Sequence, residues 1–466
     1  MKREKELVKN TIVLAIGSFL PRMVSIITIP ILTACLSKKE YGVYDLLSTL
    51  VMLVIPIATL QIQSAAFRFL IDCRENIEEV KKIITNIFVL TIPIAIGVSF
   101  LIIFFFPSMN DLERLLISGY FLCDVVYTMI GQIVRGLSYN KIFSLGAIIL
   151  AIIDCLNIVL LVFIFDKGLI GVLFSSCLSR AVAIIFQCQH IKLVGFIDFS
   201  QVSMKKIREM ISYSWPMIPN NLSNWVLKLS DRLIISVVLG VEANAIYAIA
   251  NKIPSLLSMG QSVMIAAWQE NASIALNDKN VNEYYSVMFD RIFKMVLGFT
   301  ALIIGFMPVL FTTLVKGEYE EAYIQMPILI IGMFFACMSS FQGGIYIAHK
   351  KTVSVGITTI LAAGINIVVH LLLINKLGIM AGSVSTLVAY FFLYFFRVFD
   401  VRRFQKISYV FRTQIFLLII IIVMLFICAQ RTYFCNVINM IVGIFLCMVL
   451  NKDVVISIIK RIPKRL

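Results

Sequence analysis

Ionisable residues placed inside long apolar runs are the feature of this sequence that could do chemistry. Eight of them lie well within such runs: Arg22, Asp124, Asp154, Arg180, Lys228, Asp231, Arg232 and Lys252. An ionisable side chain in mid-membrane costs at least about 2.5–3.5 kcal/mol on insertion scales, so it usually faces a polar interior and marks a substrate or ion path. The structural alternative is that acids and cations on neighbouring helices only pair with each other.

The densest polar stretch is "PMIPNNLSNWVLKLSDRLIISVVLG", residues 216–240. With a helical period of about 3.6 residues, Asn220, Asn224, Lys228 and Asp231 fall on one stripe and Arg232 at its edge. The opposite face is apolar, so the segment is predicted to be an amphipathic transmembrane helix. Its stripe must face protein or water, because lipid would leave the polar groups unsatisfied. The alternative for Asp231 and Arg232 is that they only cap the outer end of the helix.

The following apolar run contains Asn251 and Lys252, just before Pro254. Counted from the helix ends, Lys252 is predicted to lie near the depth of Lys228 and Arg232. Three cations at similar depth suit an anionic ligand. Phosphate is the obvious candidate, because Lys binds it as a point charge and Arg as a fork.

The first half of the chain has its own polar residues. Arg22 follows Pro21 about halfway along the first apolar run, and we expect it to line a cavity, with an ion pair as the alternative. Asp124 and Asp154 either line the cavity or form hydrogen bonds between helices. Arg180 either lines the cavity or pairs with one of these acids. The three residues are thus predicted to be ion-coupling or structural pairs.

The elements that must position these residues are transmembrane helices. The chain has 466 residues, of which 60% are hydrophobic and 14% charged, and its mean hydropathy is +0.96. Soluble domains are about 45–50% apolar and about 25% charged. The excess is spread over runs close to the ~20 residues that cross a bilayer. We therefore predict an all-α polytopic membrane protein with about fourteen spans, at 11–36, 46–67, 83–106, 112–134, 142–165, 168–190, 211–239, 244–268, 289–315, 324–348, 353–374, 377–398, 413–429 and 433–450.

Charge predicts the orientation and argues against several function classes. Most of the 41 Lys and Arg residues fall on one side of the predicted membrane, which places both termini in the cytoplasm. The net charge of +15 is therefore explained by the topology, and no nucleic-acid partner is expected.

The ten Cys residues lie mostly in apolar runs without paired spacing, and the three His residues are scattered. Without a phosphate-binding loop or paired carboxylates, we expect no metal, no cofactor and no enzymatic activity.

An internal repeat predicts the domain organisation. Residues 141–171 resemble residues 351–382: Lys141, Ser144, Gly146 and Gly168 match Lys351, Ser354, Gly356 and Gly378. Six predicted spans separate the copies, so both start inside, and the repeat is parallel. We expect a six-helix lobe at 1–200, a second at 201–400, and at 401–466 two appended helices with a basic cytoplasmic tail.

Residues 214–257, "SWPMIPNNLSNWVLKLSDRLIISVVLGVEANAIYAIANKIPSLL", resemble the Wzx-type polysaccharide flippases. These proteins belong to the multidrug/oligosaccharidyl-lipid/polysaccharide exporter superfamily. "LSKKEYGVYDL" at 36–46, "YEEAYIQMPIL" at 319–329 and residues 347–390 also fit this family, and the likeness covers most of residues 1–400. It implies two six-helix lobes around a central cavity that works by alternating access.

The resemblance also implies a function. The expected activity is translocation of undecaprenyl-pyrophosphate-linked oligosaccharide repeat units across the bacterial cytoplasmic (inner) membrane, for capsule, exopolysaccharide or O-antigen synthesis. Coupling to an ion gradient is implied, with membrane lipid, a polysaccharide polymerase and a chain-length regulator as partners. The alternative is a multidrug or organic-cation antiporter on the same scaffold, which would favour an acidic and aromatic cavity. A membrane polymerase would need larger external loops than this chain has.

Overall fold

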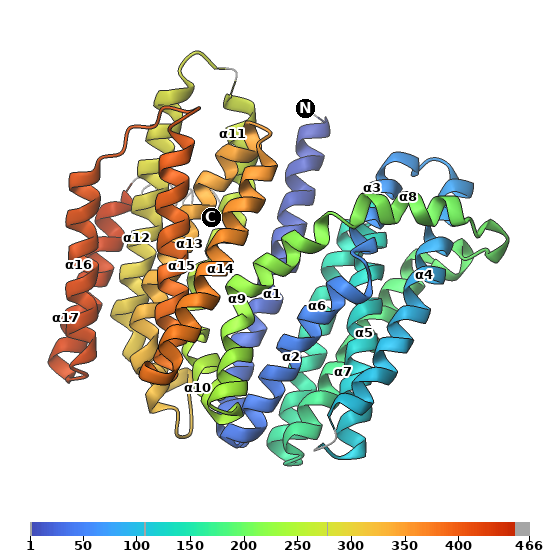
Figure 1. The fold of residues 1–466 in the computed structure, drawn as a ribbon, viewed down its shortest axis with the longest axis horizontal. Coiled ribbons are helices and arrows are strands. Elements are labelled where there is room, and N and C mark those ends of the chain that lie inside the picture. Colours follow the sequence, from blue (N-terminus) through green and yellow to red (C-terminus); the bar gives the residue numbers. More distant parts are fainter. Residues whose placement is uncertain (1, 107–108, 277, 453–466) are drawn as a thin grey trace, which may run out of the picture. The chain divides into compact units, whose positions relative to one another are not determined.

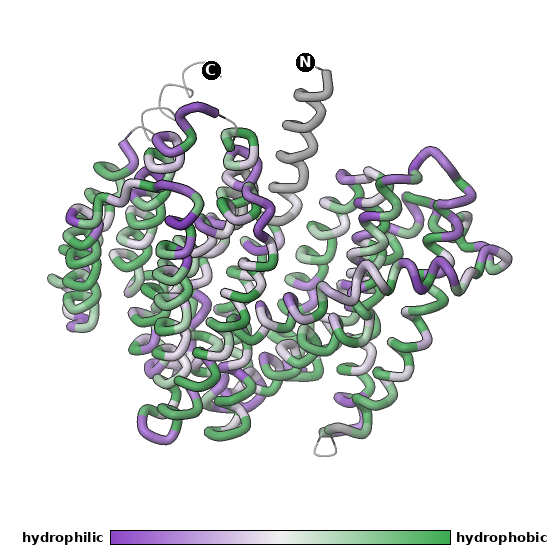
Figure 2. The backbone as a smooth tube through the Cα atoms, turned by 45° about the horizontal axis from the view of Figure 1, so that its top comes forward, coloured by the Kyte–Doolittle hydropathy of each residue, from purple (hydrophilic) through white to green (hydrophobic). Residues whose placement is uncertain are grey.

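The computed structural model describes residues 2–106, 109–276 and 278–452, which form helices and no strand. The chain divides into two compact units, Met1–Trp225 and Val226–Leu466. The division falls within helix α9 (Met217–Val238), after the basic connector that the sequence suggested as the boundary between two lobes. Helix interiors are apolar and polar residues gather at many helix ends and in loops (Figure 2). The all-α, multi-pass architecture predicted from composition is confirmed.

Eleven helices in the described part of the chain are long and apolar enough to cross a membrane. Helix α9, which carries Lys228, Asp231 and Arg232, is not among them, and neither are α10 and α11. The count of fourteen spans therefore stays a prediction.

Two expected spans have different bounds in the structure. The span expected at 46–67 ends at Ala58, and a new helix begins at Ile62, because Leu60 and Gln61 adopt left-handed backbone angles that end the first helix. The span expected at 244–268 is two helices, α10 (Val241–Ala250) and α11 (Lys252–Ala275), which meet at Asn251. Pro254 lies in the first turn of α11, where its missing N–H costs no helical hydrogen bond.

Unit 1 is built from helices that pack around two apolar clusters (Figure 1). One cluster joins α3, α4 and α5, and the other joins α2, α4, α5 and α7. The helices of this unit, before α9, are α1 (Lys2–Cys35), α2 (Lys38–Ala58), α3 (Ile62–Cys73), α4 (Ile77–Phe105), α5 (Asp111–Gly136), α6 (Asn140–Asn157) with the π-helical η1 (Ile158–Ile164), α7 (Gly168–Ile191), the short η2 (Leu193–Phe196) and η3 (Phe199–Gln201), and α8 (Met204–Ser214).

The "LSKKEYG" motif has a clear structural role at the start of α2. Ser37 and Glu40 form a capping box, in which the Ser37 Oγ accepts from the Glu40 N–H at 3.2 Å and the Glu40 carboxylate accepts from the Ser37 N–H at 3.0 Å. The other Glu40 oxygen accepts from the Leu169 N–H at 3.3 Å. One side chain thus fixes the start of α2 and ties it to the start of α7.

Unit 2 contains the second part of α9 together with α10, α11, α12 (Val281–Leu314), α13 (Glu320–Ala348), α14 (Thr352–Leu377), α15 (Met380–Val401), α16 (Phe411–Ala429) and α17 (Tyr433–Leu450). Helix α13 is largely buried and packs against α10, α11 and α15. The last two helices are part of this unit, because α17 packs along α12. A Cβ at Gly443 would lie 2.6 Å from the Ala301 carbonyl oxygen, so glycine is what permits this close approach.

The two copies of the sequence repeat share a backbone feature. Gly168 and Gly378, which match in the repeat, both adopt positive φ, at 50° and 56°. Gly168 is the first residue of α7, after η1, and Gly378 directly follows α14, so each lies where one long helical segment gives way to the next. Both are positions where a residue with a side chain would be strained.

Candidate functional site

The polar stripe of α9 follows one continuous helix, and its first half leaves polar side chains accessible. Asn220 and Lys228 are exposed and Asn224 is half-buried. The Asn224 Nδ2 donates to the Asn220 carbonyl oxygen at 2.9 Å. On another side of this helix the Trp225 indole is buried and donates to the Thr49 carbonyl oxygen at 3.1 Å. The helix therefore has one packed side and one polar side, as the sequence predicted.

Asp231 has a different environment from the rest of the stripe. Its side chain is buried, at 1% exposure for the residue, and both carboxylate oxygens are fully occupied. Oδ1 accepts from His370 Nδ1 at 2.6 Å and Ser385 Oγ at 3.2 Å. Oδ2 accepts from Thr386 Oγ1 at 2.6 Å and Tyr247 OH at 3.0 Å. We call these five residues the Asp231 network.

The Asp231 network joins α9, α10, α14 and α15 inside unit 2. This geometry differs from the expectation that Asp231 lines a cavity beside Lys228, and it differs equally from a cap at the helix end. Because four donors surround the carboxylate, its charge is well solvated by the protein itself. Asp231 is therefore suited to positioning α9 against three other helices, and direct ligand contact by this residue stays a prediction.

His370 is the residue of this network that sequence reasoning missed. It is completely buried, and its Nε2 has no hydrogen-bond partner among the described residues. The signal was present, because a histidine within an apolar run is as costly in lipid as the acids and cations that were selected. Its partner could not be read from the sequence, since Asp231 lies 139 positions earlier.

The helix break at Asn251 places two predicted site residues at the junction of α10 and α11. Asn251 and Lys252 are both half-buried, and the Asn251 Nδ2 donates to the Tyr247 carbonyl oxygen at 2.9 Å. Tyr247 in turn donates its hydroxyl hydrogen to Asp231, so hydrogen bonds of Tyr247 link Asn251 to Asp231. Arg232 is half-buried on α9.

In unit 1 the structure brings Arg180 and Asp124 together as an ion pair between α7 and α5. The guanidinium also lies over the Tyr120 ring, 4.4 Å from its centroid, and donates to the Ser176 carbonyl oxygen at 3.0 Å. The predicted alternative, that Arg180 pairs with one of the acids, is confirmed for Asp124. This geometry satisfies both charges locally.

Asp154 and Arg22 occupy other parts of unit 1. The Asp154 carboxylate accepts from Ser175 Oγ at 2.9 Å and Ser179 Oγ at 3.4 Å, which links α6 to α7. Arg22 is half-buried on α1, a helix that stays continuous through Pro21 and Pro30. Roles of these residues in ion coupling or ligand contact stay predictions.

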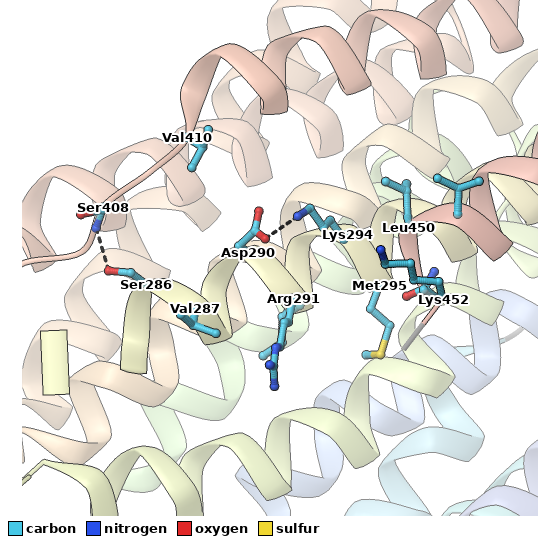
Figure 3. A pocket seen from close by; sticks show the side chains of 13 residues that line it. Ser286, Val287, Asp290, Arg291, Lys294, Met295, Ser408, Val410, Leu450 and Lys452 are labelled. Atoms are coloured by element: carbon cyan, nitrogen blue, oxygen red, sulfur yellow. Dashed lines mark hydrogen bonds and ion pairs between the residues drawn. The ribbon is translucent and has the colours of Figure 1, made fainter. Parts of the chain in front are cut away.

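A separate pocket of about 960 Å³ lies in unit 2 between α12, the segment before α16 and the end of α17 (Figure 3). It is lined by Arg291, Lys294 and Lys452 and by aliphatic residues such as Leu450. Asp290 pairs with Lys294 at 2.5 Å on one side of α12. None of the predicted site residues lines this pocket.

Comparisons with known proteins agree with this architecture. The inward closed conformation of the lipid II flippase MurJ has a TM-score of 0.69 and 14% identity, and the match covers 96% of this chain and 100% of that one. An inward-facing multidrug resistance MATE family transporter of the MOP superfamily also has a TM-score of 0.69, with 12% identity over 85% of this chain and 95% of that one. A MOP superfamily transporter from Pyrococcus furiosus, described as having a binding pocket of reverse polarity, has a TM-score of 0.59 and 14% identity over 84% and 95%.

These identities are low, so the structures show a shared fold. No curated protein matches the chain in sequence. A family model described as "Polysaccharide biosynthesis protein" matches residues 7–269, which is more than half of the 466 residues. The resemblance to polysaccharide flippases seen in the sequence is thereby confirmed at the level of the family. The chain is a multi-pass membrane protein with a flippase and transporter fold, and it belongs to the polysaccharide biosynthesis protein family.

Proposed function

We propose that the protein translocates oligosaccharide repeat units linked to undecaprenyl pyrophosphate across the bacterial cytoplasmic membrane, by alternating access. The product would be used for capsule, exopolysaccharide or O-antigen synthesis, with a polymerase and a chain-length regulator as partners. The observation that carries this proposal is the polar side of α9, where Asn220 and Lys228 are exposed on a helix of membrane-spanning length. Side chains of this kind require a polar partner within the membrane.

The chemistry of these residues suits the two polar parts of such a substrate. A Lys ammonium binds a phosphate oxygen as a point charge and an Arg guanidinium as a fork. We assign the pyrophosphate to Lys228 and Lys252, with Arg232 as a further cation of unit 2, whereas a role of Arg22 of unit 1 in substrate binding stays a prediction. Asn220, Asn224 and Asn251 offer amide donors and acceptors to sugar hydroxyls. The polysaccharide biosynthesis family supports a substrate of this chemical class.

Buried charge in unit 2 suggests how translocation is driven. The Asp231 carboxylate lies in a fully buried position, where four hydrogen bonds stabilise it and one of them comes from His370. If His370 takes up a proton, the pair becomes neutral without breaking any of its hydrogen bonds. Tyr247 and Tyr390 are titratable groups that also interact with the carboxylate, and Arg232 follows Asp231 in the chain. We therefore propose that one proton binds at the Asp231–His370 pair during the cycle, and that Asp124, Arg180 and Asp154 have structural roles.

The pyrophosphate assignment is tested by combining Lys228→Ala with Lys252→Ala in a strain whose surface glycan depends on this protein. We expect glycan export to fall at least ~10-fold, and labelled repeat units to accumulate inside, because two phosphate contacts are lost. Lys406→Ala removes an exposed cation outside the site and is the matched control. Full export by the double variant, at normal protein level, would contradict the assignment.

Proton coupling is tested with His370→Asn, which keeps an amide donor near the position of Nδ1 but removes the titratable ring. We expect normal protein levels, and export that no longer responds to collapse of the proton gradient by an uncoupler. Export by the variant that responds to the uncoupler as the wild type does would exclude this pair as the proton site. Resistance to a panel of organic cations in the expressing strain would instead support the multidrug alternative.

A further inference from the structure

The connector that follows α7 exposes large apolar side chains outside any membrane-spanning helix. Val194 is 81% exposed, Phe199 is 73% exposed and Met204 is 72% exposed, and Val202 between them is also exposed. We call these four residues the connector patch. Val194 lies on η2, Phe199 on η3, Val202 directly after η3, and Met204 is the first residue of α8, all in unit 1. Single exposed apolar residues are common on proteins, but four close together in one connector point to a surface that is covered in use.

The connector is held in place by buried polar residues of α4. Asn86 is fully buried, and its amide donates to the Gln201 carbonyl oxygen at 2.9 Å and accepts from the Ser203 N–H at 2.7 Å. Thr85, also fully buried, accepts from the Asp198 N–H at 2.9 Å. The backbone is therefore fixed on both sides of Phe199 and directly before Met204. The apolar side chains are presented by a fixed backbone, so their exposure is a built feature.

The attachment point on α4 indicates the depth of the connector patch. Helix α4 is a candidate membrane span from Ile77, and its continuous apolar run begins at Ile83. Thr85 and Asn86 lie about 12–14 Å along the helix from Ile77, at 1.5 Å per residue, and so at the start of the apolar run. This is the level at which the headgroup region of a bilayer gives way to hydrocarbon. Helix α8 lies across α4 at this end (Figure 1), with Ile207 and Met210 buried against unit 1.

The charges of the connector favour an anionic surface. Residues 192–213 contain four cations and two acids. Lys192, Lys205 and Arg208 are exposed, whereas Lys206 is half-buried and pairs with Glu209 at 3.3 Å and Glu79 at 3.7 Å. Hydrogen bonds from the Ser200 side chain and backbone lower the pKa of the Asp198 carboxyl, so this acid stays ionised. With four cations against two acids, the segment still has a net positive charge.

We propose that the connector patch inserts into the interfacial layer of a leaflet rich in anionic phospholipid, with Lys192, Lys205 and Arg208 contacting lipid phosphates. Exposed apolar side chains flanked by Lys and Arg are the combination that binds such an interface. The occupant is a lipid surface, because the patch is fixed at the level where lipid begins. This inference concerns unit 1 and does not depend on the substrate proposed above.

The test uses the full chain in nanodiscs, with a fluorescent amino acid incorporated at Phe199. Lipids with a nitroxide near the headgroup should quench it at least ~2-fold more than the same label at Lys279, an exposed position in unit 2. The quenching should increase with the fraction of phosphatidylglycerol over phosphatidylcholine. Lys205→Glu combined with Arg208→Glu should remove that increase, whereas Lys406→Glu should not.

Two outcomes would overturn the proposal. One is that the label at 199 is quenched by aqueous iodide as readily as the label at 279 and no more by nitroxide lipid. The other is that quenching by nitroxide lipid is independent of phosphatidylglycerol. Asn86→Ala provides a second measurement, because release of the connector should reduce lipid quenching at 199 while α4 stays folded. Unchanged quenching in a folded Asn86→Ala protein would also contradict the role of this clamp.

Discussion

The two units bury their membrane-level charge in different ways. In unit 1, Arg180 pairs with Asp124, and a guanidinium does not lose its proton in proteins. In unit 2, Asp231 pairs with His370, and an imidazole, unlike a guanidinium, exists in a neutral and a protonated form. On our proposal the second pair takes up one proton during the cycle and the first does not. The proposal therefore gives the first pair a structural role and the second pair a charge that changes.

The largest effect is expected from Asp231→Ala, which removes the acceptor of four hydrogen bonds in a fully buried site. It leaves His370, Ser385, Thr386 and Tyr247 without that partner. We expect a loss of about 3–5 kcal/mol in the free energy of unfolding, or failure to accumulate. Thermal unfolding in detergent measures it, with Asp278→Ala, at an exposed site of unit 2, as the control. Equal midpoints for the two variants would show that the network does not stabilise unit 2.

A smaller effect is expected from Arg180→Met, because this pair is partly accessible, with each side chain at 17% exposure. The loss should be about 2 kcal/mol, which arises mainly from the unpaired Asp124. Combining it with Asp124→Asn should recover part of that loss, since the remaining charge is gone. A double variant no more stable than Arg180→Met would show that the charge pair is not the source of the effect.

The smallest loss in the free energy of unfolding is expected from Tyr247→Phe. It removes one of the four donors to Asp231 and leaves the ring packing of α10 unchanged. We expect a loss of about 1–2 kcal/mol, in the range for a hydrogen bond to a charged group. A loss as large as that of Asp231→Ala would mean that the phenol, and not the carboxylate, holds the network together.

The fold could be predicted from the sequence more completely than the partners of the site residues. Apolar runs and charge placement predicted the helical, multi-pass fold, because backbone groups in lipid must be satisfied internally and a run of about 20 apolar residues does so as a helix. The position of Pro254 after Asn251 and Lys252 was a sufficient signal for the break between α10 and α11, yet the length of the apolar run favoured one span. The pairing of Arg180 was anticipated as an alternative. The pairing of Asp231 with His370 was not, since a helical projection gives the face of a residue but not the helices that close over it.

The most direct test of the proposed function is translocation in proteoliposomes that contain the purified protein and a fluorescent oligosaccharide linked to undecaprenyl pyrophosphate. The account predicts that wild-type protein moves this lipid between leaflets faster than protein-free vesicles under an imposed proton gradient. It also predicts that the variant with Lys228→Ala and Lys252→Ala moves it at the protein-free rate. Wild-type vesicles that match protein-free vesicles, or a double variant that matches the wild type, would contradict the account.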